Sequence, residues 1–340
     1  MPLNLPASLD SAGSILNVLR EVDVRPIRLA AEKPFVLAFL SRDMPLAQHL
    51  VDLLYRGLRE HDVPPVRVCG AFPIGAINQP GRINIAVIVA REDGNITAEQ
   101  MLAHELAQAG VHVLVCLIAD PDTPPPLRIT WLPAELVVLN SPIDDIEATR
   151  RLVHAILKFK VVDELSLARH LPAFRERVSR RLIDDTAFAN AVYSIGSGIV
   201  EIYPLAGVPM NMADVVVLTK NQAVMGYKIA LAMGLTAEFK QIMPQLATVV
   251  GGGFILRQVA RGLIGLVPGF GIIPKVGVAF AGTYATGEII HRWCAYGERV
   301  NAQLMRETYN AALVRGKNIA RLLLGRRKTS KTDADNTTLP

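Results

Sequence analysis

The chain has 340 residues, of which 51% are hydrophobic and 20% charged, and its formal net charge is +5. This length allows one to three domains, and a mean hydropathy of +0.30 exceeds what a typical soluble enzyme needs. Three widely separated cysteines argue against a disulfide framework and fit a reducing compartment.

Charge is unevenly distributed along the chain. Residues 1–160 carry 15 Lys/Arg against 18 Asp/Glu, whereas residues 161–340 carry 21 against 13. The basic excess in the second half favours an anionic partner, either lipid headgroups or nucleic acid. The first 19 residues lack a basic segment followed by an apolar run, so no signal peptide is expected. We therefore expect the cytoplasmic side of a membrane, with the cytoplasm as the alternative.

The first half of the chain alternates short apolar runs with helical periods. A lead-in helix is expected within residues 1–30, and such alternation over residues 31–162 is typical of an α/β domain with a mostly parallel sheet. We predict strands at 34–40, 65–69, 83–89, 111–119 and 135–139, and helices at 46–59, 97–109 and 144–159.

Nucleotide-binding motifs are missing from this α/β region. A P-loop requires Gly-x-x-x-x-Gly-Lys-Ser/Thr after the first strand, because its backbone N–H groups and its lysine hold the phosphates. Here the first strand is followed by Ser41-Arg-Asp-Met-Pro-Leu-Ala47, which has neither glycine nor lysine. No Asn-Lys-x-Asp motif occurs either, so GTP binding is disfavoured. An unconventional nucleotide-binding enzyme ranks lowest among our hypotheses.

No catalytic, metal or cofactor site emerges from the sequence. The histidines are scattered, and the segment His104-Glu105 lacks the second histidine of a zincin helix. Ser194 and Ser197 do not form a Gly-x-Ser-x-Gly elbow, so we interpret them as small residues at helix contacts.

Residues 163–325 are predicted to form an all-α domain of apolar helical hairpins. A basic helix at 172–182 precedes the apolar segments, and a helix at 299–325 follows them, before a basic, polar and disordered tail at 326–340. The long apolar arms are expected at 186–203, 210–233, 245–266 and 275–297.

Two turns within this domain share a Pro-x-x-Gly design. Pro204 and Gly207 recur after 64 residues as Pro268 and Gly271, each pair between apolar segments. Proline lacks the helical N–H and glycine accepts positive φ, so both copies are predicted to be sharp hairpin turns.

The composition of the arms does not decide whether lipid or protein covers them. Charges inside the arms argue against simple spanning helices, because each costs about 2.5–3.5 kcal/mol near a bilayer centre. Glycine-rich segments instead favour close helix packing, as in membrane proteins and tight bundles. We predict polar contacts between the arms by Asp214, Gln222, Arg257 and Arg261.

The C-terminal segment is basic. No acidic residue lies between Arg315 and Asp333, and the candidates for contact with anionic lipid are Arg321, Arg326, Arg327 and Lys328. The alternative is a solvated helix end whose charges complement the helix dipole. Nucleic acid is disfavoured because no aromatic side chains are interleaved.

The region 190–297 resembles the YcjF-type, GTPase-associated family of domains of unknown function. The resemblance rests on Pro204-Leu-Ala-Gly207, Asp214–Leu218 with Gln222, Leu266–Gly271 and Ala285-Thr-Gly287. It implies a bacterial protein whose α/β half occupies the position of a G domain. Because this chain lacks the nucleotide motifs, the resemblance implies a degenerate, P-loop GTPase-like domain.

These observations favour a non-enzymatic, membrane-associated accessory or regulatory protein. It is expected to act with a GTPase or another partner through a pseudo-GTPase domain and a helical hairpin module. The alternative is a soluble interaction or homo-oligomerisation module without membrane contact.

Overall fold

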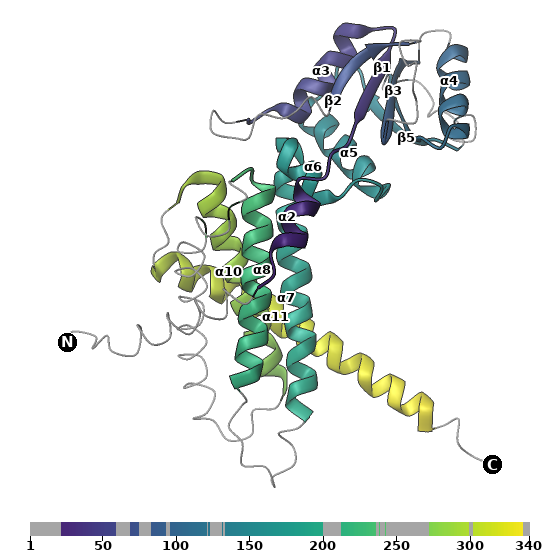
Figure 1. Ribbon diagram of the computed structural model, residues 1–340. Helices are drawn as coiled ribbons and strands as arrows, with labels where there is room; N and C mark the ends of the chain where they lie inside the picture. Colours follow the sequence, from purple (N-terminus) through teal and green to yellow (C-terminus); the bar gives the residue numbers. More distant parts are fainter. Residues whose placement is uncertain are drawn as a thin grey trace. The chain divides into compact units, whose positions relative to one another are not determined.

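The computed structural model describes residues 22–58, 69–74, 83–92, 96–120, 122, 131, 133–199, 212–235, 238, 242, 272–298 and 302–335 (Figure 1). The chain forms two compact units, of which one comprises Ile27–Val178. The other comprises Ser179–Pro340 together with the N-terminal residues up to Pro26. We call them the α/β unit and the helical unit.

The α/β unit is a parallel sheet with helices on both faces, as the sequence predicts. Its described elements, starting with a short helix at the boundary of the unit, are α2 (Arg25–Ala31), β1 (Leu37–Ser41), α3 (Met44–Tyr55), β2 (Cys69–Pro73), β3 (Ile85–Arg91), α4 (Thr97–Gln108), β4 (His112–Ala119), β5 (Glu135–Asn140), α5 (Asp145–Lys158), α6 (Glu164–His170) and the 3₁₀ turn η3 (Pro172–Phe174).

The strand order is β2-β1-β3-β4-β5, and every neighbouring pair is parallel. β1 is buried along its whole length, and only one end residue is exposed in each of β3 and β4. This pattern is expected where helices cover both faces of a sheet. The edge strands β2 and β5 are more exposed, because each has a neighbour on one side only.

Helices α3 and α4 lie on opposite faces of this sheet (Figure 1). Helix α5 shares the face of α3, and Asp145 at its start joins the two helices. His49 Nε2 lies 2.9 Å from Asp145 Oδ1, and Arg56 Nη2 lies 2.8 Å from Asp145 Oδ2. Ala103 and Leu106 of α4 pack on the other face within an apolar cluster that includes Ile88.

One predicted strand and one predicted boundary differ from the structure. The strand expected at 65–69 begins at Cys69, and residues 59–68 lie outside the described part of the chain. The division between the units falls after Val178 rather than after residue 162.

The segment between these two positions, which the sequence assigns to the all-α domain, is largely buried. Leu167 and Phe174 are fully buried, and Arg169 and Arg175 are only 6% and 5% exposed. Ser166 Oγ also donates to the Lys33 carbonyl at 2.7 Å. This segment therefore completes the core of the α/β unit.

The helical unit contains α7 (Arg175–Ile199, from Ser179), α8 (Met212–Ala232), α10 (Ile272–Tyr296) and α11 (Ala302–Asp335). They correspond to the predicted arms at 186–203, 210–233 and 275–297 and to the final helix. The arm at 245–266 and the lead-in helix around residues 14–22 lie outside the described residues, apart from Val22.

Helix α11 corrects the predicted tail. It continues to Asp335, whereas the sequence predicts disorder from residue 326. The intervening residues include arginine, lysine and alanine, which are good helix formers, and no proline interrupts them before Pro340.

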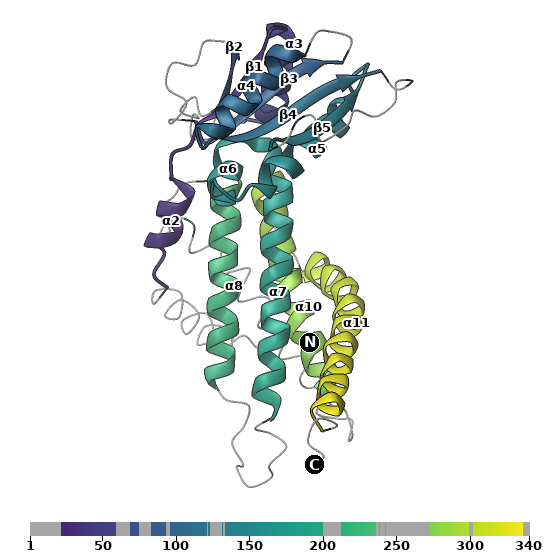
Figure 2. The same cartoon turned by 90° about the vertical axis from the view of Figure 1, so that its right-hand side faces the viewer.

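Contacts within the helical unit define the direction of each helix. Asn190 of α7 bonds Asn221 of α8, while Ile183 of α7 and Met225 of α8 both pack at Gly287 of α10. These pairs make α7 antiparallel to α8 and α10. The paired helices α7 and α8 lie side by side in Figure 2.

Helices α10 and α11 approach very closely through two glycines. A Cβ atom added at Gly316 would lie 2.7 Å from the Gly277 carbonyl oxygen. Beside this contact, the Arg315 guanidinium lies over the rings of Phe280 and Tyr284, at 5.5 and 5.2 Å from their centroids. Arg315 Nη1 also lies 2.8 Å from Asp184 Oδ1 of α7. A single arginine thus links three helices.

None of the helices in the described part of the chain combines the length with the apolar character that crossing a bilayer requires.

The two contact glycines should respond differently to alanine. Gly316→Ala should reduce the free energy of unfolding by about 1–3 kcal/mol, because its methyl group meets a backbone oxygen that cannot move alone. The matched variant Gly277→Ala meets only ordinary contacts, the nearest at 3.5 Å. It should be neutral or stabilising by up to about 1 kcal/mol. Urea unfolding measures both, and equal effects would contradict this packing.

Candidate functional site

In a doubly wound parallel sheet, ligands bind beyond the carboxyl ends of the strands, where adjacent crossovers leave in opposite directions. That position lies between β1 and β3 here, since β2 flanks β1 on its other side. We call this the sheet edge, and its polar side chains are Ser41, Arg42, Asp43, Arg91 and Glu99.

Among residues 43–47, all but Met44 lack a backbone N–H that is free to bind a phosphate. The Asp43 N–H donates to Ser41 Oγ at 3.0 Å, and the Leu46 N–H donates to Asp43 Oδ1 at 3.1 Å. The Ala47 N–H donates to the Asp43 carbonyl at 3.0 Å, and Pro45 has no N–H. A phosphate at a helix N-terminus needs such donors. These four residues have none left to offer.

The Asp43 carboxylate occupies the place of an anion at this helix start. The hydrogen bond from the Leu46 N–H and the nearby Arg91 guanidinium hold the pKa of Asp43 below its ordinary value. Arg91 Nε lies 3.0 Å from Asp43 Oδ2. The carboxylate is therefore ionised at neutral pH and repels a second anion.

A second ion pair closes the same edge. Arg42 Nε lies 3.1 Å from Glu99 Oε1, and Arg42 Nη2 lies 3.2 Å from Glu99 Oε2. This two-point geometry is the strongest that arginine makes with a carboxylate. Only 6% of the Glu99 side chain is exposed, so separating the pair would leave a buried charge.

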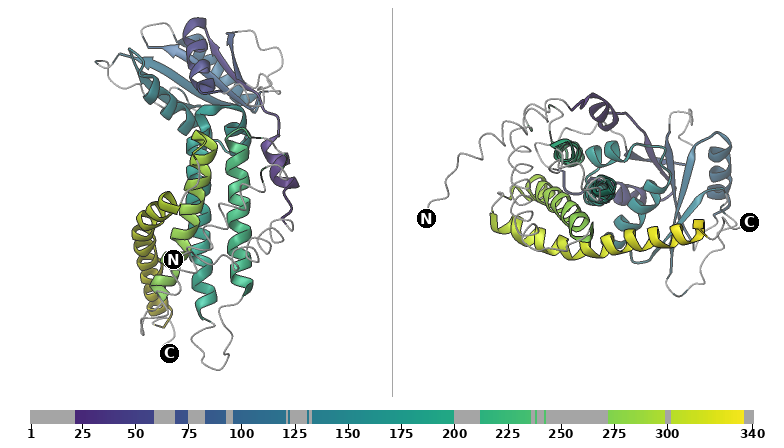
Figure 3. Two further views of the ribbon diagram at one scale, coloured as in Figure 1. Left: turned by 90° about the vertical axis from the view of Figure 1, so that its left-hand side faces the viewer. Right: turned by 90° about the horizontal axis from the view of Figure 1, so that it is seen from below.

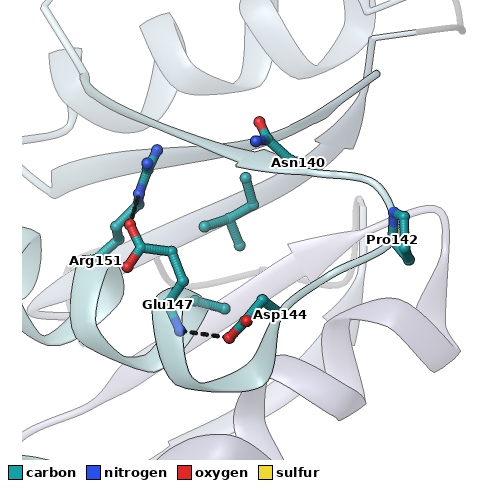
Figure 4. Close-up of a pocket in the computed structure, with 7 residues that line it drawn as sticks. Asn140, Pro142, Asp144, Glu147 and Arg151 are labelled. Atoms are coloured by element: carbon teal, nitrogen blue, oxygen red, sulfur yellow. Dashed lines mark hydrogen bonds and ion pairs between the residues drawn. The ribbon is translucent and has the colours of Figure 1, made fainter. Parts of the chain in front are cut away.

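A shallow pocket lies beyond the end of β5, where Asp144, Glu147 and Arg151 approach one another (Figure 4). Asp144 Oδ1 accepts from the N–H groups of Ile146 and Glu147, both at 2.9 Å. Glu147 Oε1 pairs with Arg151 Nε at 2.5 Å, and Arg151 Nη1 donates to the Val138 carbonyl at 2.7 Å. Its charged groups therefore satisfy one another.

Metal and thiol chemistry find no support in the described residues. No group of three or more His, Cys, Asp or Glu side chains there is placed to hold a metal ion. Burial raises the pKa of the Cys116 thiol to about 12 and also raises that of Cys69. Both thiols therefore stay protonated at neutral pH and lack the thiolate that a nucleophile needs.

The helical unit contains a buried polar network centred on Thr283 of α10. Asn190 Nδ2 of α7 donates to Thr283 Oγ1 at 2.8 Å, and Gln222 Nε2 of α8 donates to the same oxygen at 3.1 Å. Asn221 Nδ2 donates in turn to Asn190 Oδ1 at 2.7 Å. Asn190 and Gln222 are fully buried and Thr283 is 1% exposed. Three helices thus share one hydrogen-bonded node.

A charged cluster lies at another level of the same helices. Glu288 of α10 is ion-paired with Arg180 of α7, and Glu288 Oε1 lies 3.5 Å from Arg292 Nε. The Glu288 side chain is only 9% exposed. Between this cluster and the Thr283 network lies the apolar contact of Ile183 and Met225 at Gly287.

The structure places only some of the predicted site residues. Pro204, Gly207, Pro268, Gly271, Arg257 and Arg261 lie outside the described residues. Gln222 bonds across to another helix, and Asp214 lies in α8 with an undescribed side chain. Arg321 is exposed on α11, and Arg326, Arg327 and Lys328 continue that helix.

Sequence reasoning missed Asn190 and Thr283. Both lie within predicted apolar arms, in which Gln222 is the one uncharged residue predicted to make a polar contact between arms. Uncharged polar residues inside an apolar helix are the available signal, since buried amides and hydroxyls require partners. Their mutual contact spans 93 residues and has no local signature.

Comparison with protein-family models, curated proteins and solved structures finds no significant match to this chain. The resemblance of residues 190–297 to the YcjF-type family therefore stays a hypothesis.

Removing the Thr283 hydroxyl should destabilise the helical unit strongly. Thr283→Val leaves the Asn190 and Gln222 amides without this acceptor, at about 1–3 kcal/mol for each buried donor. Thr286→Val is the matched control, because Thr286 Oγ1 donates only within its own helix, to the Gly282 carbonyl at 2.7 Å. Chemical denaturation should show a clearly larger loss of unfolding free energy for T283V than for T286V. Equal losses would contradict the hydrogen-bond network at Thr283.

The sheet edge should make stability depend on pH. The pKa of Asp43 is lowered, so its contribution is present above the ordinary value of 3.8 and is lost as the pH falls through the lower folded-state value. Asp43→Asn keeps a capping side chain but cannot ionise. Its Tm should be lower than that of the wild type at neutral pH, and the difference should shrink as the pH falls below 3.8. Parallel profiles would contradict the ion pair.

Proposed function

We propose that this chain is a non-enzymatic accessory or regulatory protein that acts by contact with another protein. The observation that carries the proposal is the position of Asp43. In a phosphate-binding fold the start of the helix after the first strand holds the anion. Here that place holds the chain's own carboxylate, bonded to the Leu46 N–H and paired with Arg91.

The α/β unit is, in this proposal, a degenerate GTPase-like domain. Its support is a parallel sheet with β1 inside it and α3 directly after β1. The missing motifs and the internally paired sheet edge agree with a domain that has kept its architecture without nucleotide chemistry. Its remaining role is to present a folded surface to a partner, for which a GTPase is our first candidate.

The burial of residues in the helical unit supports a packed helical bundle rather than arms inserted in a membrane. From Gln222 to Ala232 every residue of α8 is buried except Val224 and Lys228, which are half-buried. Helix α10 shows the same distribution from Val276 to His291, where Val278 and Tyr284 are half-buried. Other parts of the protein thus cover these apolar residues, which favours an interaction module. The exposed Phe188 and Val192 of α7 add an apolar outer stripe suited to a protein contact.

Calorimetry on the full chain tests this proposal. Titration with GTP, GDP or ATP and Mg²⁺ should give no saturable heat up to about 1 mM ligand, and no phosphate should be released on prolonged incubation. Saturable binding of any of these nucleotides, or phosphate release above the buffer rate, would overturn the non-enzymatic assignment.

A further inference from the structure

We propose that the outer face of α11 docks on an anionic lipid bilayer. We define this face by Val314, Lys317, Arg321 and Leu322. In this arrangement Lys317 and Arg321 contact the headgroups, and Val314 and Leu322 enter the boundary between headgroups and acyl chains. The inference goes beyond the proposed function and does not depend on the sheet edge.

Burial divides α11 into an inner and an outer side. Its buried residues recur at helical spacing and pack toward α10: Met305, Tyr309, Ala312, Gly316 and Ala320. Val314 and Leu322 lie on the opposite side and are 66% and 68% exposed. Arg321 is exposed beside them, and Lys317 is exposed although its Cγ also packs near Gly277 of α10. Large apolar side chains and basic ones thus share one accessible face.

The register of α10 and α11 leaves the end of α11 without a partner from α10. Gly277 lies opposite Gly316 in this antiparallel pair, so Ile272, the first residue of α10, lies opposite about Arg321. Residues 322–335 therefore continue past α10 for about 20 Å at 1.5 Å per residue. The yellow end of α11 projects in this way in Figures 1 and 3.

Charge complementarity selects the partner. Helix α11 carries no acidic residue from Thr308 to Thr332, while its basic residues in that range are Arg315, Lys317, Arg321, Arg326, Arg327, Lys328 and Lys331. Arg315 is engaged with Asp184 and two aromatic rings, so it is not counted toward the partner. Basic clusters of this size are attracted to anionic membrane surfaces.

Exposed apolar side chains favour lipid over nucleic acid. Single-stranded nucleic acids are bound by aromatic side chains that stack on the bases, and α11 has no aromatic residue after Tyr309, which is buried. A nucleic acid would leave Val314 and Leu322 in water. A bilayer interface covers them while the basic side chains reach the headgroups.

Flotation of the full chain with vesicles tests the inference. The protein should bind vesicles of phosphatidylcholine with about 30% phosphatidylserine, should not bind phosphatidylcholine alone, and should dissociate in about 0.5 M NaCl. Each basic residue near the surface contributes about a factor of five, so Lys317→Gln with Arg321→Gln should weaken binding about thirtyfold. Val314→Ser with Leu322→Ser should weaken it independently.

The matched control neutralises two exposed arginines elsewhere, Arg28 and Arg177. Arg28→Gln with Arg177→Gln changes the net charge equally and should leave vesicle binding unchanged. All six substituted residues are exposed, and an unchanged circular dichroism spectrum and Tm verify folding.

Three results would overturn the inference: failure of the wild-type chain to float, wild-type affinity in both α11 variants, or equal loss in the control. Binding to a single-stranded oligonucleotide that is lost in K317Q/R321Q, without any effect of V314S/L322S on flotation, would assign the face to nucleic acid. None of these outcomes bears on the nucleotide titration, so the proposed function is tested separately.

Discussion

The hydroxyl of Thr283 accepts hydrogen bonds from Asn190 and Gln222, two fully buried amides on different helices. Buried donors are costly without an acceptor, so α7, α8 and α10 pack favourably only in the register that brings all three residues together. Apolar contacts alone are less selective, because shifted helices can still bury similar areas. Helix α11 then takes its position from α10, through the contact of Gly277 with Gly316.

The need of polar groups for hydrogen-bond partners also organises the α/β unit. Ser41 Oγ accepts from the Asp43 N–H and donates to the Val89 carbonyl at 2.9 Å, so its hydroxyl is used twice. Arg42 and Glu99 pair across the edge, as do Arg91 and Asp43. In most doubly wound folds, groups beyond the carboxyl ends of the strands bind a ligand. Here the chain itself supplies the partners of these side chains.

Much of the architecture could be predicted from local patterns. The strands β1, β3, β4 and β5 come from continuous apolar runs, and their alternation with helices predicts the parallel sheet. The unit boundary could not be predicted in the same way. Arg169 and Arg175 suggest a solvent-exposed segment, yet both are buried. A buried guanidinium needs hydrogen-bond partners from the folded chain, such as the Ala168 carbonyl that accepts from Arg175 Nε at 3.4 Å.

The sequence by itself determined the α/β and all-α halves, the absence of nucleotide motifs and the basic C-terminal segment, since each depends on residue type and spacing along the chain. Only the tertiary structure decided what covers α8 and α10, which polar groups meet at Thr283, and that Asp43 occupies the helix start. These depend on residues far apart in the sequence, as with Asn190 and Thr283. Their partners are selected by the alignment of whole elements, and no local pattern encodes that alignment.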